Sequence, residues 1–237
     1  MRNFALIGES LEHSFSSKYF NNKFSDEKVD ARYINFEIKN ISDVRILIKK
    51  HKLSGLNITI PYKKTIMPFL DNISADAKEI GAINTIKIIN GQLIGYNTDI
   101  LGFTQSILPI IESRKKALIL GDGGAALAVK FGLKKLNIKY KTVNRKTSLD
   151  YSDITQKIIS LHKIIINTTP LGTYPNTDTF PKIPYDYLDK DHLLFDLIYN
   201  PSETQFLKYG RAKGAEIKNG LDMLKIQAEE SWKIWNL

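Results

Sequence analysis

Short runs rich in isoleucine and valine alternate along the chain with longer stretches whose apolar residues recur at helical spacing. This alternation is typical of βα units that build a parallel sheet. Serine is a favoured N-cap, so Ser42 and Ser74 predict two helix starts. Asn90-Gly91 between two apolar runs predicts a hairpin turn. The expected elements are strands 3–7, 32–37 and 56–60, helices 42–50 and 74–80, and hairpin strands 85–89 and 92–95.

The same pattern begins again at Ala117 and predicts a second α/β unit. Four prolines between 170 and 184 are too many for regular structure and predict a long loop. After Gly220 the apolar residues return to helical spacing, which predicts a closing amphipathic helix. The expected elements before it are strand 117–120, helix 125–136, strand 139–143, helix 153–161, strand 163–167 and strand 193–195.

The length of 237 residues suits two modest cores, and 43% hydrophobic with 25% charged residues indicates a folded chain. The absence of cysteine excludes disulfides, thiolate metal sites and a cysteine nucleophile. No apolar stretch approaches the roughly 18 residues of a membrane helix. The N-terminus reaches Glu9 before the apolar core of a secretory signal could form. We therefore expect a soluble, cytoplasmic protein with no membrane partner.

The chain carries 34 Lys and Arg residues against 25 Asp and Glu residues, a formal net charge of +9. Such an excess would suit nucleic acid, an anionic membrane or small anionic ligands. A coding bias toward lysine, isoleucine and asparagine explains it equally well, so net charge alone assigns no partner. No basic run interleaved with aromatic residues is present, and we expect no nucleic-acid partner.

Residues 121–126 read Gly-Asp-Gly-Gly-Ala-Ala, follow an expected strand and open an expected helix. They fit the dinucleotide-binding pattern G-x-G-x-x-A. Gly121 would permit the tight turn, Gly123 would let the backbone approach a pyrophosphate, and Ala126 would let helix and strand pack closely. A plain tight turn would also explain the glycines, so the motif by itself is a hypothesis.

Twenty-three residues after Gly121 the chain reads Asn144-Arg145-Lys146. An NAD site usually has an acidic residue here to accept from the ribose 2′-hydroxyl. The cations instead predict a site for the 2′-phosphate of NADP, through contacts worth roughly 1.5–3 kcal/mol each, although two solvated surface cations would give the same sequence. Asp122 would repel a pyrophosphate, so we expect its side chain to face solvent.

Polar residues also follow the expected strands of the first unit. The strand that ends at Ile60 alternates, so its apolar residues take one face and Asn57 and Thr59 take the other. Ligands of open α/β sheets bind beyond the carboxyl ends of strands. Thr59 and a following lysine, Lys63 or Lys64, would lie there, and spacing does not rank the two lysines.

Three further polar segments could lie close to Thr59 and this lysine. The segment after the first strand carries Ser14 and Ser16, and either could simply be a helix N-cap. Asn84 places an amide at the start of an expected strand. Asp99 precedes an apolar helical segment, and the residues alone favour a role as its cap.

Several motifs occur in a definite order along the chain. They are HSFS at 13–16, NITIPYK at 57–63, GAINT at 81–85, YNTD at 96–99, GDGGAA at 121–126, NRK at 144–146, NTTP at 167–170, DLIY at 196–199 and GLDM at 220–223. Together they resemble the shikimate dehydrogenase family. No single motif is decisive, but the ordered combination is specific and spans essentially the whole chain.

The resemblance implies two α/β domains. Residues 1–100 and 211–237 would form a substrate-binding domain, completed by the C-terminal helix, and residues 101–210 an inserted Rossmann-like NADP-binding domain. It also implies reversible reduction of 3-dehydroshikimate to shikimate by hydride transfer, within chorismate and aromatic amino acid biosynthesis, without a metal. The protein would be a monomer or a homodimer.

The same resemblance implies residue roles. Lys63, in preference to Lys64, would be the general acid or base at the reacting oxygen, and Asp99 would orient it. The substrate ligands would be Ser14, Ser16, Asn57, Thr59, Asn84, Tyr199 and Gln227. The cofactor ligands would be Gly121, Gly123, Gly124, Ala125, Ala126, Asn144, Arg145, Lys146, Thr168, Gly220 and Met223.

Two other functions compete with this one. A quinate/shikimate dehydrogenase that uses NAD would share most of the motifs, but no acidic residue follows Val143. A non-catalytic Rossmann-type sensor would not require both Lys63 and Asp99.

Overall fold

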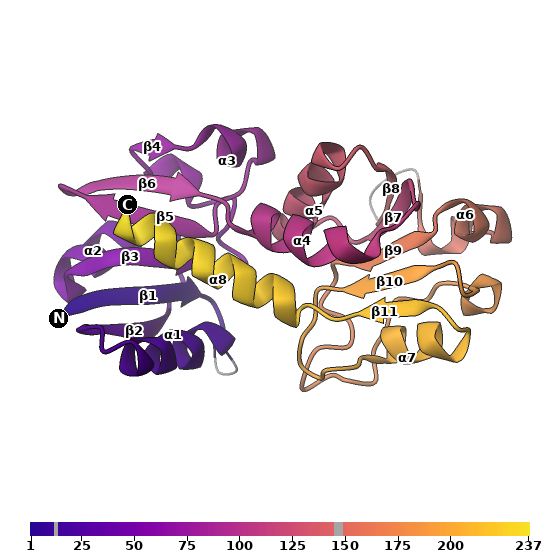
Figure 1. Cartoon of the computed structure of the whole chain (residues 1–237). Coiled ribbons are helices and arrows are strands. Elements are labelled where there is room, and N and C mark those ends of the chain that lie inside the picture. Colours follow the sequence, from indigo (N-terminus) through magenta and orange to yellow (C-terminus); the bar gives the residue numbers. More distant parts are fainter. Residues whose placement is uncertain (12–13, 145–148) are drawn as a thin grey trace. The chain divides into compact units, whose positions relative to one another are not determined.

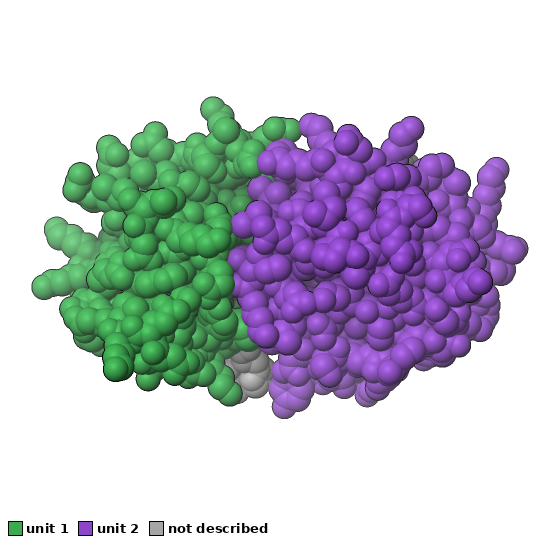
Figure 2. Space-filling model, viewed as in Figure 1, with its two compact units in different colours: residues 1–98, 228–237 green, residues 99–227 purple. Residues whose placement is uncertain are grey.

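The computed structural model describes residues 1–11, 14–144 and 149–237. The chain divides into two compact units, which Figure 2 shows in different colours. Unit 1 comprises residues 1–98 and 228–237, and unit 2 comprises residues 99–227. Within the described residues each unit holds one β-sheet with helices packed on it, so the prediction of two α/β domains is confirmed.

Unit 1 is built on a mixed six-stranded sheet (Figure 1). β1 lies parallel between β2 and β3, whereas β5 pairs antiparallel with both β3 and β6. Asn90 and Gly91 between β5 and β6 both have positive φ, as a tight hairpin turn requires, so the predicted hairpin is confirmed. In spatial order the strands are β2 (Ala31–Glu37), β1 (Arg2–Gly8), β3 (Leu53–Ile58), β5 (Thr85–Ile89), β6 (Gln92–Tyr96) and β4 (Asn72–Ile73).

Alternate residues of β1 enter two different cores of unit 1. Phe4 and Leu6 pack with the aromatic residues of α1 and of the end of α8, whereas Ala5 and Ile7 pack with α2 and α3. The strand is buried on both faces, which is typical of a sheet covered by helices on each side. The helices are α1 (Phe15–Asp26), α2 (Val44–His51), α3 (Ala75–Ile80) and the C-terminal part of α8 (Leu221–Asn236).

The strand expected at 56–60 begins earlier and ends two residues sooner, at Ile58. Ile60 is 67% exposed, so the prediction that it shares the face of Ile58 is wrong. The chain leaves the sheet at Thr59, whose carbonyl accepts the N–H of Tyr62 over 2.9 Å. This turn, rather than a continued strand, presents the residues that follow.

Two predicted caps also differ from the structure. The helix expected after Ser42 begins with a 3-10 turn at Ile41, because the Asn40 side chain accepts the N–H of Ser42 over 3.2 Å. Ser74 does occupy the N-cap of α3, but its side chain makes no cap hydrogen bond.

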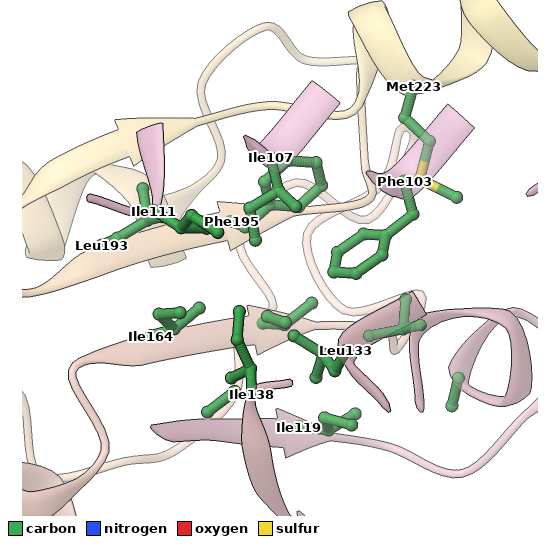
Figure 3. Packing of buried hydrophobic residues seen from close by; sticks show 14 residues of the cluster. Phe103, Ile107, Ile111, Ile119, Leu133, Ile138, Ile164, Leu193, Phe195 and Met223 are labelled. Carbon is green, nitrogen blue, oxygen red and sulfur yellow. The ribbon is translucent and has the colours of Figure 1, made fainter. Parts of the chain in front are cut away.

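Unit 2 contains a five-stranded, entirely parallel sheet. In β7, Ala117 and Ile119 belong to the core shown in Figure 3, and Leu118 and Leu120 to the core on the other face. This is the doubly covered sheet of a Rossmann-like domain. The strands in spatial order are β11 (Glu216–Lys218), β10 (Leu193–Asp196), β9 (Ile164–Asn167), β7 (Lys116–Leu120) and β8 (Lys139–Val143). The helices are α4 (Asp99–Ile107), α5 (Gly124–Lys135), α6 (Gln156–Leu161), α7 (Gln205–Ala212) and the start of α8.

Three details of unit 2 differ from the sequence pattern. α6 begins at Gln156 rather than at 153, because the Thr155 side chain accepts the N–H of Ile158 and caps the helix. The pattern did not predict α7 or β11. β11 pairs with β10, so residues 216–218 lie in the sheet of unit 2, although the expected substrate domain resumed at 211. The proline-rich segment 170–184 contains no helix or strand, as predicted.

Candidate active site

In unit 1, segments far apart in the sequence meet at one edge of the sheet. β1, β3 and β6 end at this edge, and β5 starts there because it runs antiparallel to β3. The Thr59 N–H donates to the Ile7 carbonyl over 2.9 Å, and the Ile58 N–H donates to the Asn84 carbonyl over the same distance. The tertiary structure therefore brings Thr59 and Asn84 together.

Ser14 and Ser16 lie at the start of α1, which follows β1. Ser14 is the N-cap residue, but its side chain makes no cap hydrogen bond. Its hydroxyl oxygen is buried and has no hydrogen-bond partner among the described residues. Ser14 therefore does not cap α1 through its side chain, and its role as a substrate ligand stays a prediction. His13 lies outside the described residues.

The turn after β3 holds Lys63 at the same edge. The Lys63 carbonyl accepts the N–H of Ile83 over 2.7 Å, which ties this turn to the segment that leads into Asn84. Tyr62 is buried, and its hydroxyl donates to the Ile38 carbonyl. Lys63 is half-buried and Lys64 is exposed. The structure thus separates two lysines that spacing could not rank.

Asn57 belongs to a buried polar network. Its Oδ1 accepts the Tyr33 hydroxyl over 2.7 Å, and its Nδ2 lies within 3.1 Å of the Asn84 carbonyl and of the Thr85 and Ser231 hydroxyls. These contacts join β2, β3, β5 and α8 within unit 1. The amide has protein partners on both its atoms, so its role as a substrate ligand stays a prediction beside a clear structural role.

Asn84 fixes the backbone just before Asp99. Its Oδ1 accepts the N–H of Thr98 over 2.7 Å, and its Nδ2 donates to the Thr98 hydroxyl over 3.0 Å. Thr98 is the last residue of the N-terminal segment of unit 1. Asp99 is the first residue of α4 in unit 2 and is 6% exposed. A carboxylate in the first turn of a helix is favoured by the helix dipole.

The glycine motif forms the turn between β7 and α5. Gly121 has a φ of +106°, and a Cβ there would lie 2.8 Å from the Thr168 hydroxyl, so this position requires glycine. At Gly123, the N-cap of α5, a Cβ would meet no atom within 4 Å, so the backbone is open to a ligand. Gly124 and Ala125 form the first turn of α5, and Ala126 is fully buried against the sheet. The geometry agrees with the predicted turn at Gly121 and the predicted close packing at Ala126, whereas cofactor binding by this segment stays a prediction.

A pocket of about 560 Å³ lies beside this turn. Its walls come from the loops that follow the carboxyl ends of β7, β8 and β9, where doubly wound sheets bind dinucleotides. Arg145 and Lys146, predicted to bind the 2′-phosphate, lie outside the described residues. The lining residues are Gly121, Asp122, Val143, Asn144, Tyr151, Thr169, Pro170 and Leu171.

A buried network that the sequence did not reveal supports the wall of this pocket. Asp196 ends β10, is fully buried, and accepts hydrogen bonds from the Thr204 hydroxyl over 2.6 Å, the Ile198 N–H over 3.0 Å and the Asn167 amide over 3.1 Å. Asn167 in turn accepts from the N–H and hydroxyl of Thr169. The sequence shows only that each residue ends an apolar run; the structure pairs the two runs as neighbouring strands.

Burial raises the pKa of the Asp196 carboxyl to about 7, against the opposing effect of its three hydrogen-bond donors. The folded state therefore binds more protons than the unfolded state between about pH 4 and pH 7, and stability falls as pH rises through that range. We expect the free energy of unfolding to drop by about 2–3 kcal/mol between pH 5 and pH 8 from this group alone. In Asp196→Asn this drop should vanish.

Urea denaturation of both proteins at the two pH values measures the difference. Asp189→Asn is the control, because Asp189 is half-exposed and its pKa is lowered by the hydrogen bonds from Lys163 and His192, even though desolvation opposes the shift. A pH dependence in Asp196→Asn equal to that of the parent would show that Asp196 does not titrate in this way.

The remaining predicted residues lie in unit 2. The Thr168 hydroxyl donates to the Leu120 carbonyl over 2.8 Å and packs against Gly121. The Gly220 N–H donates to the Ile198 carbonyl over 3.0 Å, and a Cβ at Gly220 would overlap the backbone of Leu197, so only glycine fits.

Tyr199, Met223 and Gln227 differ in their surroundings. Tyr199 is half-buried just after the strand that ends at Asp196. The Met223 side chain packs beside Phe103 in the core of Figure 3, which leaves its backbone for any cofactor contact. Gln227 is buried, and its Nε2 donates to the Leu224 carbonyl over 2.9 Å.

Known proteins resemble this chain in sequence and in fold. Residues 6–86 match the family described as the shikimate dehydrogenase substrate binding domain. The shikimate dehydrogenase (NADP(+)) of Methanococcus maripaludis is 41% identical over 97% of this chain and 90% of its own length. A crystal structure of shikimate dehydrogenase 1 from Peptoclostridium difficile superposes with a TM-score of 0.90 at 39% identity, covering 100% of this chain and 92% of that one.

A second crystal structure, of a shikimate dehydrogenase in complex with NADP+, has a TM-score of 0.88 at 37% identity and covers 99% of this chain and 90% of that chain. The likeness therefore extends over both units and is not confined to the matched substrate-binding segment. The chain belongs to the shikimate dehydrogenase family.

Proposed function

We propose that this protein is an NADP-dependent shikimate dehydrogenase, which reversibly reduces 3-dehydroshikimate to shikimate in aromatic amino acid biosynthesis. One observation carries the proposal: unit 2 presents a glycine turn open to a pyrophosphate, while unit 1 gathers hydroxyl, amide and ammonium groups at one sheet edge. Such groups suit a small polyhydroxy acid.

The residues of unit 2 fit the cofactor. Gly121 permits the tight turn, and Gly123 leaves the backbone accessible at the start of α5, whose free N–H groups favour a pyrophosphate. Asn144 lines the pocket immediately before Arg145 and Lys146, which would bind the 2′-phosphate. Thr168 and Gly220 would border the same cofactor. NADPH, when bound, supplies the hydride.

Lys63 would act at the substrate oxygen. Hydride that arrives at a carbonyl carbon leaves negative charge on the oxygen, and an ammonium group stabilises that charge and donates the proton. In the reverse direction the neutral amine accepts the proton from the hydroxyl. Asp99 would orient Lys63 through a hydrogen bond, the role that the family resemblance implies for it.

The substrate would be held by hydroxyl and amide side chains around this lysine. The buried hydroxyl of Ser14 supports this assignment most directly, because it has no hydrogen-bond partner among the described residues. The other proposed ligands are Ser16, Asn57, Thr59, Asn84, Tyr199 and Gln227. Steady-state assay of the purified protein with shikimate and NADP+, followed at the nicotinamide absorbance band, tests the proposal. Absence of NADPH formation would contradict it.

The NAD-dependent quinate/shikimate alternative is not favoured, because the near full-length relatives are named for NADP(+). Parallel assays with NAD+ and NADP+, and with quinate and shikimate, compare the two directly. The oligomeric state, monomer or homodimer, stays a prediction that gel filtration tests. The cytoplasmic location also stays a prediction.

Replacing Arg145 by alanine should raise the KM for NADPH about tenfold or more, because one charge-assisted contact to the 2′-phosphate is lost. The KM for shikimate should change little. Equal rises in both constants would argue against a cofactor role. Lys141→Ala is a matched control, since it removes one cation from the exposed part of β8.

A further inference from the structure

Asp122 lies inside the glycine turn, one residue before the N-cap Gly123. Its side chain is 42% exposed, as expected for an acid that faces solvent. It nevertheless has partners: the ammonium of Lys130 on α5 forms an ion pair with one carboxylate oxygen, and the Asn144 amide donates to the other over 3.5 Å. Asp122 therefore links the turn to α5 and to the end of β8.

The negative charge of Asp122 disfavours the binding of a pyrophosphate at this turn. Asp122 lines the pocket beside the start of α5, where the helix dipole and free N–H groups favour the negative pyrophosphate. An uncompensated carboxylate on the same turn would repel that pyrophosphate and compete with it for the positive end of the helix. A cation paired with Asp122 removes most of this repulsion.

We propose that Lys130 sets the affinity of this turn for NADP by neutralising Asp122. Lys130 lies in the second turn of α5, and its side chain is only 21% exposed, so it is held against the turn. It acts through Asp122 and is a positioning residue, not a catalytic one. This inference rests on the proposed cofactor binding and adds a residue that the glycine motif does not include.

Direct binding of NADPH to the full-length protein, without substrate, tests the inference. Isothermal titration at low salt should give a dissociation constant about tenfold higher for Lys130→Met than for the parent. Asp122→Asn/Lys130→Met should return it to within about twofold of the parent, because the carboxylate that needs compensation is gone. Asp122→Asn alone should bind at least as tightly as the parent.

Lys134→Met is the matched control. Lys134 lies on the same helix one turn further from the glycine turn, and its loss changes the net charge of the chain equally. The dissociation constant of Lys134→Met for NADPH should stay within about twofold of the parent value. The effect of Lys130→Met should also shrink as salt is raised toward 0.5 M, since the pair is partly exposed and is screened there.

The double variant keeps the test independent of folding. A loss of binding caused by damage to α5 would persist in Asp122→Asn/Lys130→Met, whereas a loss caused by the bare carboxylate would be reversed. An unchanged dissociation constant in Lys130→Met, or a double variant as weak as the single one, would overturn the inference. Failure of the parent itself to bind NADPH would instead contradict the proposed function.

Discussion

Replacing Lys63 by alanine should lower kcat roughly 10²- to 10⁴-fold, the usual range for a lost general acid or base. The KM for shikimate should change much less, because the hydroxyl and amide groups proposed as substrate ligands are all retained. The turn that carries Lys63 is held by main-chain bonds, including that from the Ile83 N–H to the Lys63 carbonyl, and these survive the substitution. The fold should therefore be retained.

Lys64→Ala is the control for this experiment. Lys64 is exposed and differs from Lys63 by one position, so its removal should leave kcat within about twofold of the parent value. Steady-state assay in both directions of the reaction measures the two variants. Near-normal turnover in Lys63→Ala, or an equal loss in Lys64→Ala, would remove Lys63 from the mechanism.

Replacing Trp235 by alanine should lower the free energy of unfolding by about 3–5 kcal/mol. Trp235 lies in the last turn of α8, is 7% exposed and stacks on Phe4 with ring centroids 4.7 Å apart. A Cβ at Gly55 would lie 2.5 Å from its ring, so the indole packs directly on the backbone of β3. Its Nε1 also donates to the Ile86 carbonyl over 3.0 Å.

Ile46→Ala is the comparison for stability. Ile46 is 69% exposed on α2, so its truncation should change the free energy of unfolding by no more than about 0.5 kcal/mol. Urea denaturation followed by far-UV circular dichroism compares both variants with the parent. A loss below about 1 kcal/mol in Trp235→Ala would show that the end of α8 contributes little to unit 1.

Much of the fold was predictable because local patterns and tertiary packing agree. The apolar run at 117–120 is buried on both faces of a parallel sheet, and Asn90-Gly91 has the backbone that its turn type demands. The sequence-based predictions were wrong where a tertiary contact determines the local structure. β11 is three half-buried residues whose assignment to a strand depends on pairing with β10, and Ile60 leaves the sheet because the chain turns at Thr59.

The candidate site also contains features that the local sequence predicts and contacts that it does not predict. Gly121 was predictable because its turn requires a conformation that glycine adopts readily. The pairing of Asp122 with Lys130 was not, because the two charges lie eight residues apart and carry no periodic signal. The same holds for Asp196, whose three donors lie at the end of the neighbouring strand β9 and in the segment between β10 and α7.

By itself the sequence determined the two α/β units and the glycine turn, because each depends on neighbouring residues and on the regular periods of helix and strand. The preference for NADP was predicted from Arg145 and Lys146, and the relatives named for NADP(+) support it. Only the tertiary structure decided which polar groups of unit 1 share an edge, which of them already have protein partners, and which acids are buried or compensated. Those properties depend on strand order and on contacts between distant segments, and no local pattern encodes them.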